Sequence, residues 1–286
     1  MIVYFNNKLI ELDKVQISPF DRGFLFADGV YESIRTYSGK LFKFDEHLNR
    51  LKRSLSEIRI KFEKLDELKK IIYQLAEINN LTGKDFLVYI QITRGVSFPR
   101  KHSFPSHDEQ PTIFILVSKL DKNTPDQQNG VKVILLEDLR WLRCDIKSVS
   151  LLPAVLANQK AIESSAVEAV LFRNDLITEG SHTNFFGIDN GKVVTAPKSN
   201  LILSGITRDI VIGLCKKLKI KVEEEFIKLN ELNKYEEFFI TSTTKEIFPV
   251  VRVDDRIVGS GKPGDITKKL QAAFKELTES AKNNER

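Results

Sequence analysis

The sequence is poor in cysteine and contains no long apolar run. Its 286 residues include two cysteines, Cys144 and Cys215, which are too few for a disulfide framework and do not form a C-x-x-C pair. We therefore expect a reduced, cytoplasmic protein. No apolar run reaches the roughly 18 residues of a membrane-spanning helix. The first residues, MIVYFNNKLIELDK, lack the basic leader and the small-residue cleavage site of a signal peptide. We therefore expect no membrane partner.

Histidine is also scarce, and charge of one sign is nowhere concentrated. The four histidines show no metal-site spacing, so we expect no metal centre; they are His47, His102, His107 and His182. Lysine and arginine (44) exceed aspartate and glutamate (39) only slightly. The two signs alternate along KFEKLDELKK and KLKIKVEEEF, which favours solvated helix faces over a nucleic-acid surface. With 42% apolar and 29% charged residues, the composition is that of a soluble globular protein.

Hydrophobic periodicity predicts an α+β protein. Asn6 and Asn7 separate two short apolar runs, as in a β-hairpin. Apolar residues recur at steps of three and four within 48–58 and 68–78, which predicts two helices, the first with Asp45 at its N-cap. Later strand-like runs alternate with further helices, which start near Pro153, near Gly205 and before Ile266.

A polar stretch at 121–130 is the best candidate for a domain boundary. It reads DKNTPDQQNG and combines a proline and a glycine with charged residues, as linkers do. We therefore expect an N-terminal α+β domain over 1–120 and a larger C-terminal domain over 121–286.

Two motifs predict an anion site in the second half of the chain. In LSGITRDIVIGLCKKL a glycine loop leads directly into a helix, where the unpaired N–H groups and the helix dipole attract an anion. A plain helix N-cap is the simpler interpretation. In EFFITSTTKEI a strand ends in four hydroxyl residues, 241–244, which suit phosphate oxygens or a turn equally well. Together, the two motifs suggest a phosphate cup.

Three further motifs could carry chemistry. Glu179 lies in a tight connection, where it is either a solvated turn residue or a partner for a cationic heterocycle nitrogen. Lys147 lies between apolar segments, and a partly desolvated lysine becomes a nucleophilic amine, although most lysines are surface residues. Arg100 and His102 share one face of an extended segment and could clamp a carboxylate, or form a solvent-facing basic loop.

Taken in order, these motifs resemble the fold-type IV pyridoxal-5′-phosphate enzymes. The segments DRGFLFADGVYE, EHLNRL, PRKH, RCDIKS, TEGSHTNFFGI, GITRD and TSTT span nearly the whole chain. The family includes D-amino-acid aminotransferases, branched-chain aminotransferases and aminodeoxychorismate lyases. The segments WLRCDIKS and P-R-x-H are most similar to the first group. The resemblance implies a two-domain fold with a smaller N-terminal α/β domain and a larger, β-barrel-like C-terminal α+β domain.

The resemblance also implies a role for each motif. Lys147 is the implied catalytic residue, which bonds to the cofactor and moves a proton at the substrate α-carbon. Glu179 is implied to pair with the pyridine nitrogen, and Leu203 to pack against the cofactor ring. The implied phosphate ligands are Arg50, Ile206, Thr207, Ser242 and Thr243.

For the substrate, the resemblance implies carboxylate binding by Tyr31, Arg100 and His102. In such enzymes the arginine and histidine arrive on a loop of the neighbouring subunit, so we expect a homodimer with a shared active site. One position departs from the pattern, because His182 stands where D-amino-acid aminotransferases carry serine. We assign no catalytic role to it.

The predicted function is transamination of D-amino acids, such as D-alanine and D-glutamate, with 2-oxo acids such as 2-oxoglutarate. A branched-chain L-aminotransferase would use the same cofactor machinery with the substrate carboxylate reversed. An aminodeoxychorismate lyase would consume no amino acceptor. A non-catalytic nucleic-acid-binding protein is the alternative of another class, and the dispersed charges disfavour it.

Overall fold

The computed structural model describes residues 1–105, 110–120 and 124–283. Contacts divide the chain into an N-terminal unit, which comprises 1–120 and 146–150, and a C-terminal unit, which comprises 124–145 and 151–280. The linker expected at 121–130 lies partly outside the described residues, and the described part of it contains a short helix. His107 also lies outside the described residues. The expected boundary after residue 120 stays a prediction. The segment that carries Lys147, expected in the C-terminal domain, belongs with the N-terminal unit.

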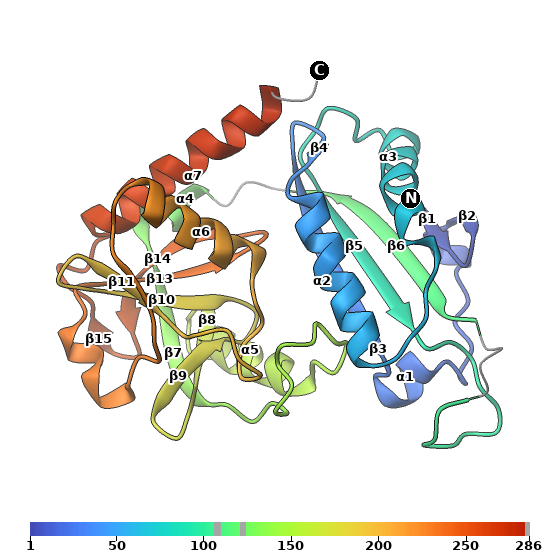
Figure 1. Ribbon diagram of the computed structural model, residues 1–286, viewed down its shortest axis with the longest axis horizontal. Coiled ribbons are helices and arrows are strands. Elements are labelled where there is room, and N and C mark those ends of the chain that lie inside the picture. The colour runs from blue at the N-terminus through green and yellow to red at the C-terminus, as the bar shows by residue number, and fades with distance from the viewer. Residues whose placement is uncertain (106–109, 121–123, 284–286) are drawn as a thin grey trace. The chain divides into compact units, whose positions relative to one another are not determined.

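The N-terminal unit is an antiparallel sheet with helices against one face (Figure 1). The strand order is β2-β1-β6-β5-β3-β4. The strands are β1 (Ile2–Phe5), β2 (Lys8–Glu11), β3 (Gly29–Tyr37), β4 (Lys40–Leu41), β5 (Phe86–Thr93) and β6 (Thr112–Lys119). The helices are α1 (Arg22–Phe26), α2 (Phe44–Glu57) and α3 (Leu68–Ile78), with 3-10 turns η1 (Leu12–Lys14) and η2 (Lys64–Glu67). The predicted hairpin and both predicted helices are confirmed.

The core of this unit follows from two periodicities. Every second residue of β5, from Phe86 to Ile92, is buried, and α2 and α3 place apolar residues at steps of three and four against the same face. The predicted N-cap of α2 is wrong. The helix begins at Phe44, two residues earlier than expected, with Lys43 at the N-cap in the left-handed region (φ 57°). Asp45 lies in the first turn, where its carboxylate still favours the helix dipole.

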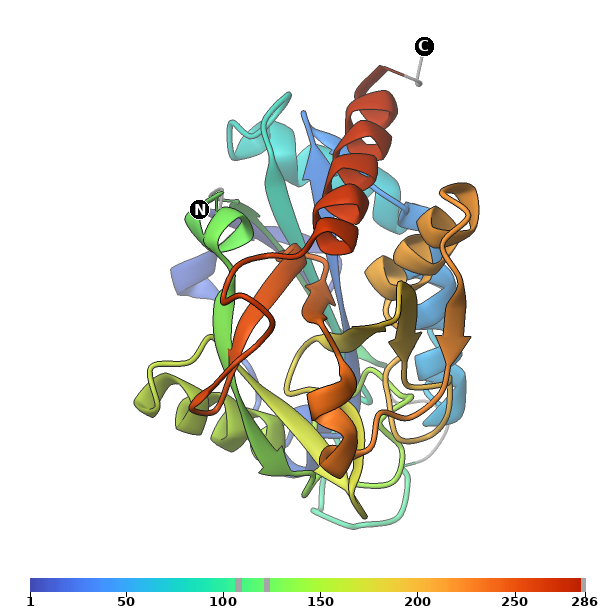
Figure 2. The same cartoon turned by 90° about the vertical axis from the view of Figure 1, so that its left-hand side faces the viewer.

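The C-terminal unit is a curled mixed sheet flanked by helices (Figure 2). The strand order is β12-β11-β10-β13-β14-β7-β8-β9, and β15 pairs with β14. The strands are β7 (Val131–Glu137), β8 (Glu168–Arg173), β9 (Leu176–Gly180), β10 (Asn184–Asp189), β11 (Lys192–Thr195), β12 (Val222–Glu224), β13 (Glu237–Ser242), β14 (Glu246–Val253) and β15 (Arg256–Ile257). The helices are α4 (Thr124–Asn129), α5 (Leu152–Glu163), α6 (Ile206–Lys217) and α7 (Asp265–Asn283), with a 3-10 turn η3 (Leu229–Lys234).

The chain therefore has the α+β class predicted from its sequence. In the C-terminal unit, β7 pairs in parallel with both β8 and β14, whereas β10, β13 and β14 are antiparallel neighbours. Within the described residues, no helix is long and apolar enough to cross a membrane. The ends of β9, β10 and β13 bring several of the predicted site residues to one end of the curled sheet.

Candidate functional site

Lys147 lies against β3 of the N-terminal unit. The backbone N–H of Tyr31 donates to the carbonyl of Lys147 (N–O 3.0 Å), and the N–H of Lys147 donates to Ser54 Oγ (3.2 Å). These bonds hold the lysine backbone between a strand and α2. Its Nζ lies 4.1 Å from the centroid of the Tyr31 ring, so two residues predicted for the site are neighbours.

Arg50 is held by a buried glutamate that the sequence analysis did not identify. Its Nε and Nη2 donate to the two carboxylate oxygens of Glu32, at 3.0 and 2.7 Å, in the bidentate geometry that suits arginine. His47 Nδ1 lies 3.0 Å from Glu32 Oε1. Burial alone would raise the pKa of Glu32, but Arg50 and His47 hold it well below its ordinary value. Glu32 is therefore a carboxylate that fixes the direction of the Arg50 guanidinium.

Arg100 and His102 meet at one aromatic ring. The Arg100 guanidinium lies 4.4 Å from the centroid of the Phe26 ring, and the His102 ring lies 5.4 Å from the same centroid. Both side chains therefore lie against Phe26 of α1. Both are exposed on the N-terminal unit. Their binding of a carboxylate stays a prediction.

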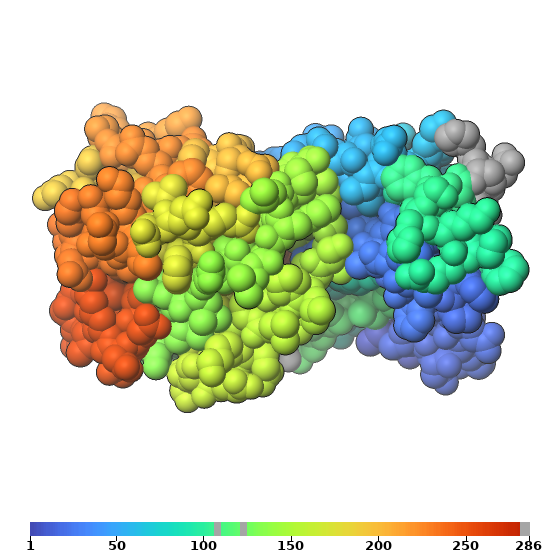
Figure 3. Space-filling view, turned by 90° about the horizontal axis from the view of Figure 1, so that it is seen from below, coloured from blue at the N-terminus to red at the C-terminus, as the bar shows by residue number. Residues whose placement is uncertain are grey.

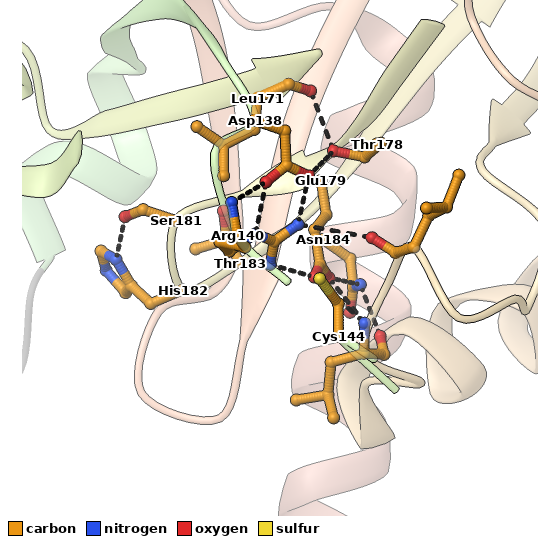
Figure 4. A network of polar contacts seen from close by, with 12 residues as sticks. Asp138, Arg140, Cys144, Leu171, Thr178, Glu179, Ser181, His182, Thr183 and Asn184 are labelled. Atoms are coloured by element: carbon orange, nitrogen blue, oxygen red, sulfur yellow. Dashed lines mark hydrogen bonds and ion pairs between the residues drawn. The ribbon is translucent and has the colours of Figure 1, made fainter. Parts of the chain in front are cut away.

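Glu179 is fully buried at the end of β9 in the C-terminal unit and has three partners (Figure 4). Arg140 Nη1 donates to Oε1 (2.6 Å), Asn184 Nδ2 donates to Oε2 (2.9 Å), and the N–H of Leu203 is 3.1 Å from both oxygens. Burial raises the pKa of Glu179 to about 7, although Arg140 opposes this rise. The solvated turn glutamate is thus excluded, and Glu179 is poised to share a proton near neutral pH.

A second carboxylate orients Arg140 toward Glu179. Arg140 Nε and Nη2 donate to the two oxygens of Asp138, both at 2.9 Å, and the hydroxyl of Thr178 donates to Asp138 Oδ2 at 3.0 Å. Burial would raise the pKa of Asp138, but the hydrogen bonds and charge of Arg140 lower it. Figure 4 shows this guanidinium between the two carboxylates. The arrangement leaves Glu179 with one fixed cationic neighbour.

The predicted phosphate cup lies beside Glu179 in the same unit. Helix α6 begins at Ile206 with Gly205 at its N-cap, and glycine has no side chain to accept from the first-turn N–H groups. Asn184 connects the parts, because its Nδ2 also donates to the carbonyl of Leu203 (2.9 Å) and its backbone pairs with Thr241 across β10 and β13. The glycine loop, the hydroxyl cluster and Glu179 therefore share one end of the sheet.

His182 faces away from this network in Figure 4. Its Nδ1 lies 3.0 Å from Ser181 Oγ and 3.1 Å from Oε2 of the buried Glu168. The Ser181 hydroxyl donates its proton to Glu168 Oε1 (2.5 Å), so Ser181 Oγ can only accept from His182. In this arrangement His182 Nδ1 carries a proton and is the donor. His182, which stands where the resemblance implies serine, therefore has its own partners in Ser181 and Glu168.

The predicted residues divide between the two units. The N-terminal unit carries Lys147, Tyr31, Arg50, Arg100 and His102. The C-terminal unit carries the remainder, which are Glu179, Leu203, Ile206, Thr207, Ser242 and Thr243. Sequence reasoning missed the residues that hold them, namely Glu32, His47, Asp138, Arg140 and Asn184. Among these residues, only Glu32 had a signal in the sequence. It stands at a buried position of the strand alternation, between Val30 and Ile34 of β3, where an apolar residue is expected.

Comparison with known proteins agrees with this geometry. Residues 29–253 match the family described as amino-transferase class IV, and the chain belongs to that family. Its members are pyridoxal-phosphate enzymes. The chain is 43% identical to a D-alanine aminotransferase of Bacillus licheniformis, over 99% of both chains. It is 39% identical to a D-alanine aminotransferase of Staphylococcus haemolyticus, over 97% of this chain and 98% of that one.

Solved structures confirm the predicted fold. The branched-chain amino acid aminotransferase of Escherichia coli superposes with a TM-score of 0.89 at 25% identity, over 97% of this chain and 94% of that chain. The two-domain fold-type IV architecture expected from the motifs is thus shown.

Proposed function

We propose that this aminotransferase converts D-amino acids, D-alanine and D-glutamate among them, to 2-oxo acids and returns the amino group to an acceptor such as 2-oxoglutarate. The observation that carries aminotransferase chemistry here is the buried Glu179 carboxylate, held by three N–H donors and with its pKa raised to about 7. The preference for D-amino acids is supported by the likeness to D-alanine aminotransferases.

The donor set fits pyridoxal 5′-phosphate. An uncapped helix N-terminus at Ile206 and Thr207, with the hydroxyls of Ser242 and Thr243, suits a phosphate dianion. The backbone N–H of Leu203 donates to Glu179, so the residue lies beside the proposed ring site, where its apolar side chain would pack against the ring. When bound, the cofactor supplies an aldehyde that takes up the amino group and a ring that withdraws electrons from the substrate α-carbon.

The residues of the chain have separate tasks in this proposal. Glu179 would hold a proton at the pyridine nitrogen, and Arg140, which donates to the Glu179 carboxylate, keeps that carboxylate in place. Lys147 would hold the cofactor through its Nζ, and its amine, once the substrate amino group has displaced it, would carry a proton to and from the substrate α-carbon. Arg50, oriented by Glu32, adds a guanidinium to the phosphate. Tyr31, Arg100 and His102 bind the substrate carboxylate.

We also propose a cytoplasmic homodimer in which the Arg100–His102 loop serves the active site of the neighbouring subunit. Two observations support this assembly and setting. Both cysteines are free and buried. The C-terminal unit exposes several large apolar side chains on and before α5, a segment coloured green to yellow-green in the space-filling view of Figure 3; they are Leu139, Trp141, Leu142, Leu152, Val155, Leu156 and Ile162. Exposed apolar side chains gathered on one segment favour an interface with another subunit.

The proposed reaction is tested by offering the holoenzyme single enantiomers of alanine, glutamate and leucine without an acceptor. We expect D-alanine and D-glutamate to convert the cofactor absorbance to that of the pyridoxamine form, and 2-oxoglutarate to restore it. Conversion by L-leucine alone would favour the branched-chain alternative. Release of pyruvate from aminodeoxychorismate, with no conversion by any amino acid, would favour the lyase.

A further inference from the structure

One buried arginine holds the backbone of the loop that carries Arg100 and His102. Arg22, whose side chain is only 5% exposed, stands at the start of α1. Its Nη1 donates to the carbonyls of Lys101 (2.7 Å) and Ser103 (3.2 Å), and its Nη2 donates to the carbonyl of His102 (3.3 Å). Three consecutive carbonyls of an exposed loop therefore converge on a single guanidinium.

The Arg22 guanidinium is itself fixed. Its Nε donates to Asp28 Oδ2 at 2.8 Å, and the same carboxylate receives Nε and Nη2 of Arg94 at 2.7 and 2.9 Å. Arg94 also donates to the carbonyls of Ile58 (2.7 Å) and Arg59 (3.1 Å), which ties the cluster to the end of α2. Two guanidinium groups thus share one carboxylate and direct their remaining N–H groups to backbone carbonyls. Such charge-assisted contacts resist reorientation.

The same short helix fixes the loop side chains as well. Phe26 lies four residues after Arg22 on α1, and the guanidinium of Arg22 is 4.8 Å from its ring centroid. Arg100 and His102 contact the same ring. Helix α1 therefore holds the loop twice, by its carbonyls through Arg22 and by its side chains through Phe26.

We propose that Arg22 is a positioning residue for substrate carboxylate binding, which it controls through the backbone of the Arg100–His102 loop. This inference rests on the proposed function, because it requires those two side chains to contact the carboxylate. An exposed loop that is ordered only on binding loses conformational entropy at that step. By ordering the loop in advance, Arg22 removes that loss, and it does so without touching the substrate or the cofactor.

The test is the kinetics of Arg22→Lys. Lysine keeps a positive charge for Asp28 but lacks the planar guanidinium, whose two Nη groups reach the three carbonyls. We expect the KM for D-alanine to rise about tenfold, as for the loss of a charge-assisted contact, with kcat and the affinity for pyridoxal 5′-phosphate unchanged. Trypsin should also cut faster after Arg100 and Lys101. Phe26→Leu, which removes the ring and leaves Arg22 in place, should raise the KM by a smaller factor.

Two controls distinguish a role of Arg22 in positioning the loop from a general loss of protein stability. Arg53→Lys, on the exposed face of α2, makes the same substitution away from the loop and should leave the KM unchanged. In an Arg100→Ala background, which itself should raise the KM, Arg22→Lys should add little, because coupled residues are not additive.

The outcomes distinguish the two proposals. If the unaltered enzyme does not convert D-alanine, the proposed function is wrong. If it does, and Arg22→Lys and Phe26→Leu both leave the KM unchanged, the positioning role is overturned while the reaction stands. Equal losses in kcat and cofactor affinity would also overturn it, because they indicate a role in stability alone.

Discussion

Glu32 and Glu179 show how single residues set the chemistry of each unit. Both carboxylates are buried, and a buried charge is tolerated only when it is paired and hydrogen-bonded. Glu32 accepts a bidentate arginine, which keeps its pKa low. Glu179 accepts a single arginine N–H with one amide and one backbone N–H, and its pKa rises to about 7. The first carboxylate is thus a fixed anchor, whereas the second can share a proton.

The anchor role of Glu32 predicts a phosphate-specific defect. Glu32→Gln keeps the size of the side chain but removes the charge that orients Arg50. We expect the Kd for pyridoxal 5′-phosphate to rise about tenfold, with the Kd for pyridoxal unchanged, as measured by absorbance titration of the apoenzyme. Glu57→Gln, at the exposed end of α2, is the matched control. Equal weakening of both ligands by Glu32→Gln would show that Glu32 does not act through the phosphate.

The contact between Glu32 and His47 predicts a loss of folding stability in acid. Burial lowers the pKa of His47 below its ordinary value of 6.5, and Glu32 only partly opposes this. Below pH 6.5 the unfolded chain therefore binds more protons than the folded protein, so the free energy of unfolding falls as the pH drops. We expect His47→Asn to flatten the decrease of Tm between about pH 7 and about pH 5. An unchanged slope would place the titrating group elsewhere.

Sequence patterns nominated candidate residues that carry a local signal, but not the residues that hold them in place. Glu179 and Arg100 stand in distinctive short motifs. Arg140 could not be paired with Glu179 from sequence, because the two are separated by 39 positions and meet only in the folded chain. The same holds for Arg22, whose carbonyl partners lie about 80 positions away. Long-range contacts of this kind leave no periodic trace in the sequence.

At the scale of elements, the N-terminus of α6 and the ends of β10 and β13 form one assembly. The sequence predicted the glycine loop and the hydroxyl cluster separately, and also predicted the helix that follows Gly205. Their proximity depends on the antiparallel register of β10 and β13, which pairs Asn184 with Thr241. That register is set by buried strand residues of the curled sheet, so the motifs alone could not show it.

This assembly explains the glycine at position 205. A Cβ atom there would overlap Asn184 Oδ1, the amide that also holds Glu179. We expect Gly205→Ala to displace Asn184, to lower the free energy of unfolding by about 1–3 kcal/mol and to weaken cofactor binding. Gly213→Ala, inside the same helix where a Cβ meets nothing, is the control in denaturation and cofactor titrations. Equal behaviour of the two variants would contradict the contact.

For the whole molecule, the two units each carry part of the predicted machinery. Composition and motif order were sufficient for the α+β class and for the resemblance to class IV enzymes. They did not show that residues 146–150, which follow the linker in sequence, belong with the N-terminal unit. This placement depends on hydrogen bonds from β3 and α2 to the Lys147 backbone, which no local pattern encodes.

The exposed apolar surface on α5 predicts how the whole molecule assembles. Leu156 is 62% exposed, and a charge there would be desolvated in a dimer but solvated in a monomer. We expect Leu156→Glu to shift the protein from dimer to monomer in sedimentation experiments and to abolish turnover with it. Leu218→Glu, on the exposed end of α6, should leave the dimer intact. A Leu156→Glu dimer with normal turnover would exclude α5 from the interface.

The covalent link at Lys147 is the claim on which the other roles depend. Borohydride reduction of the holoenzyme, followed by proteolysis and peptide mass analysis, measures it directly. The account predicts a pyridoxyl label on the peptide that contains Lys147, and no label in Lys147→Ala. A label on a different lysine, or the absence of any label in the reduced holoenzyme, would contradict it.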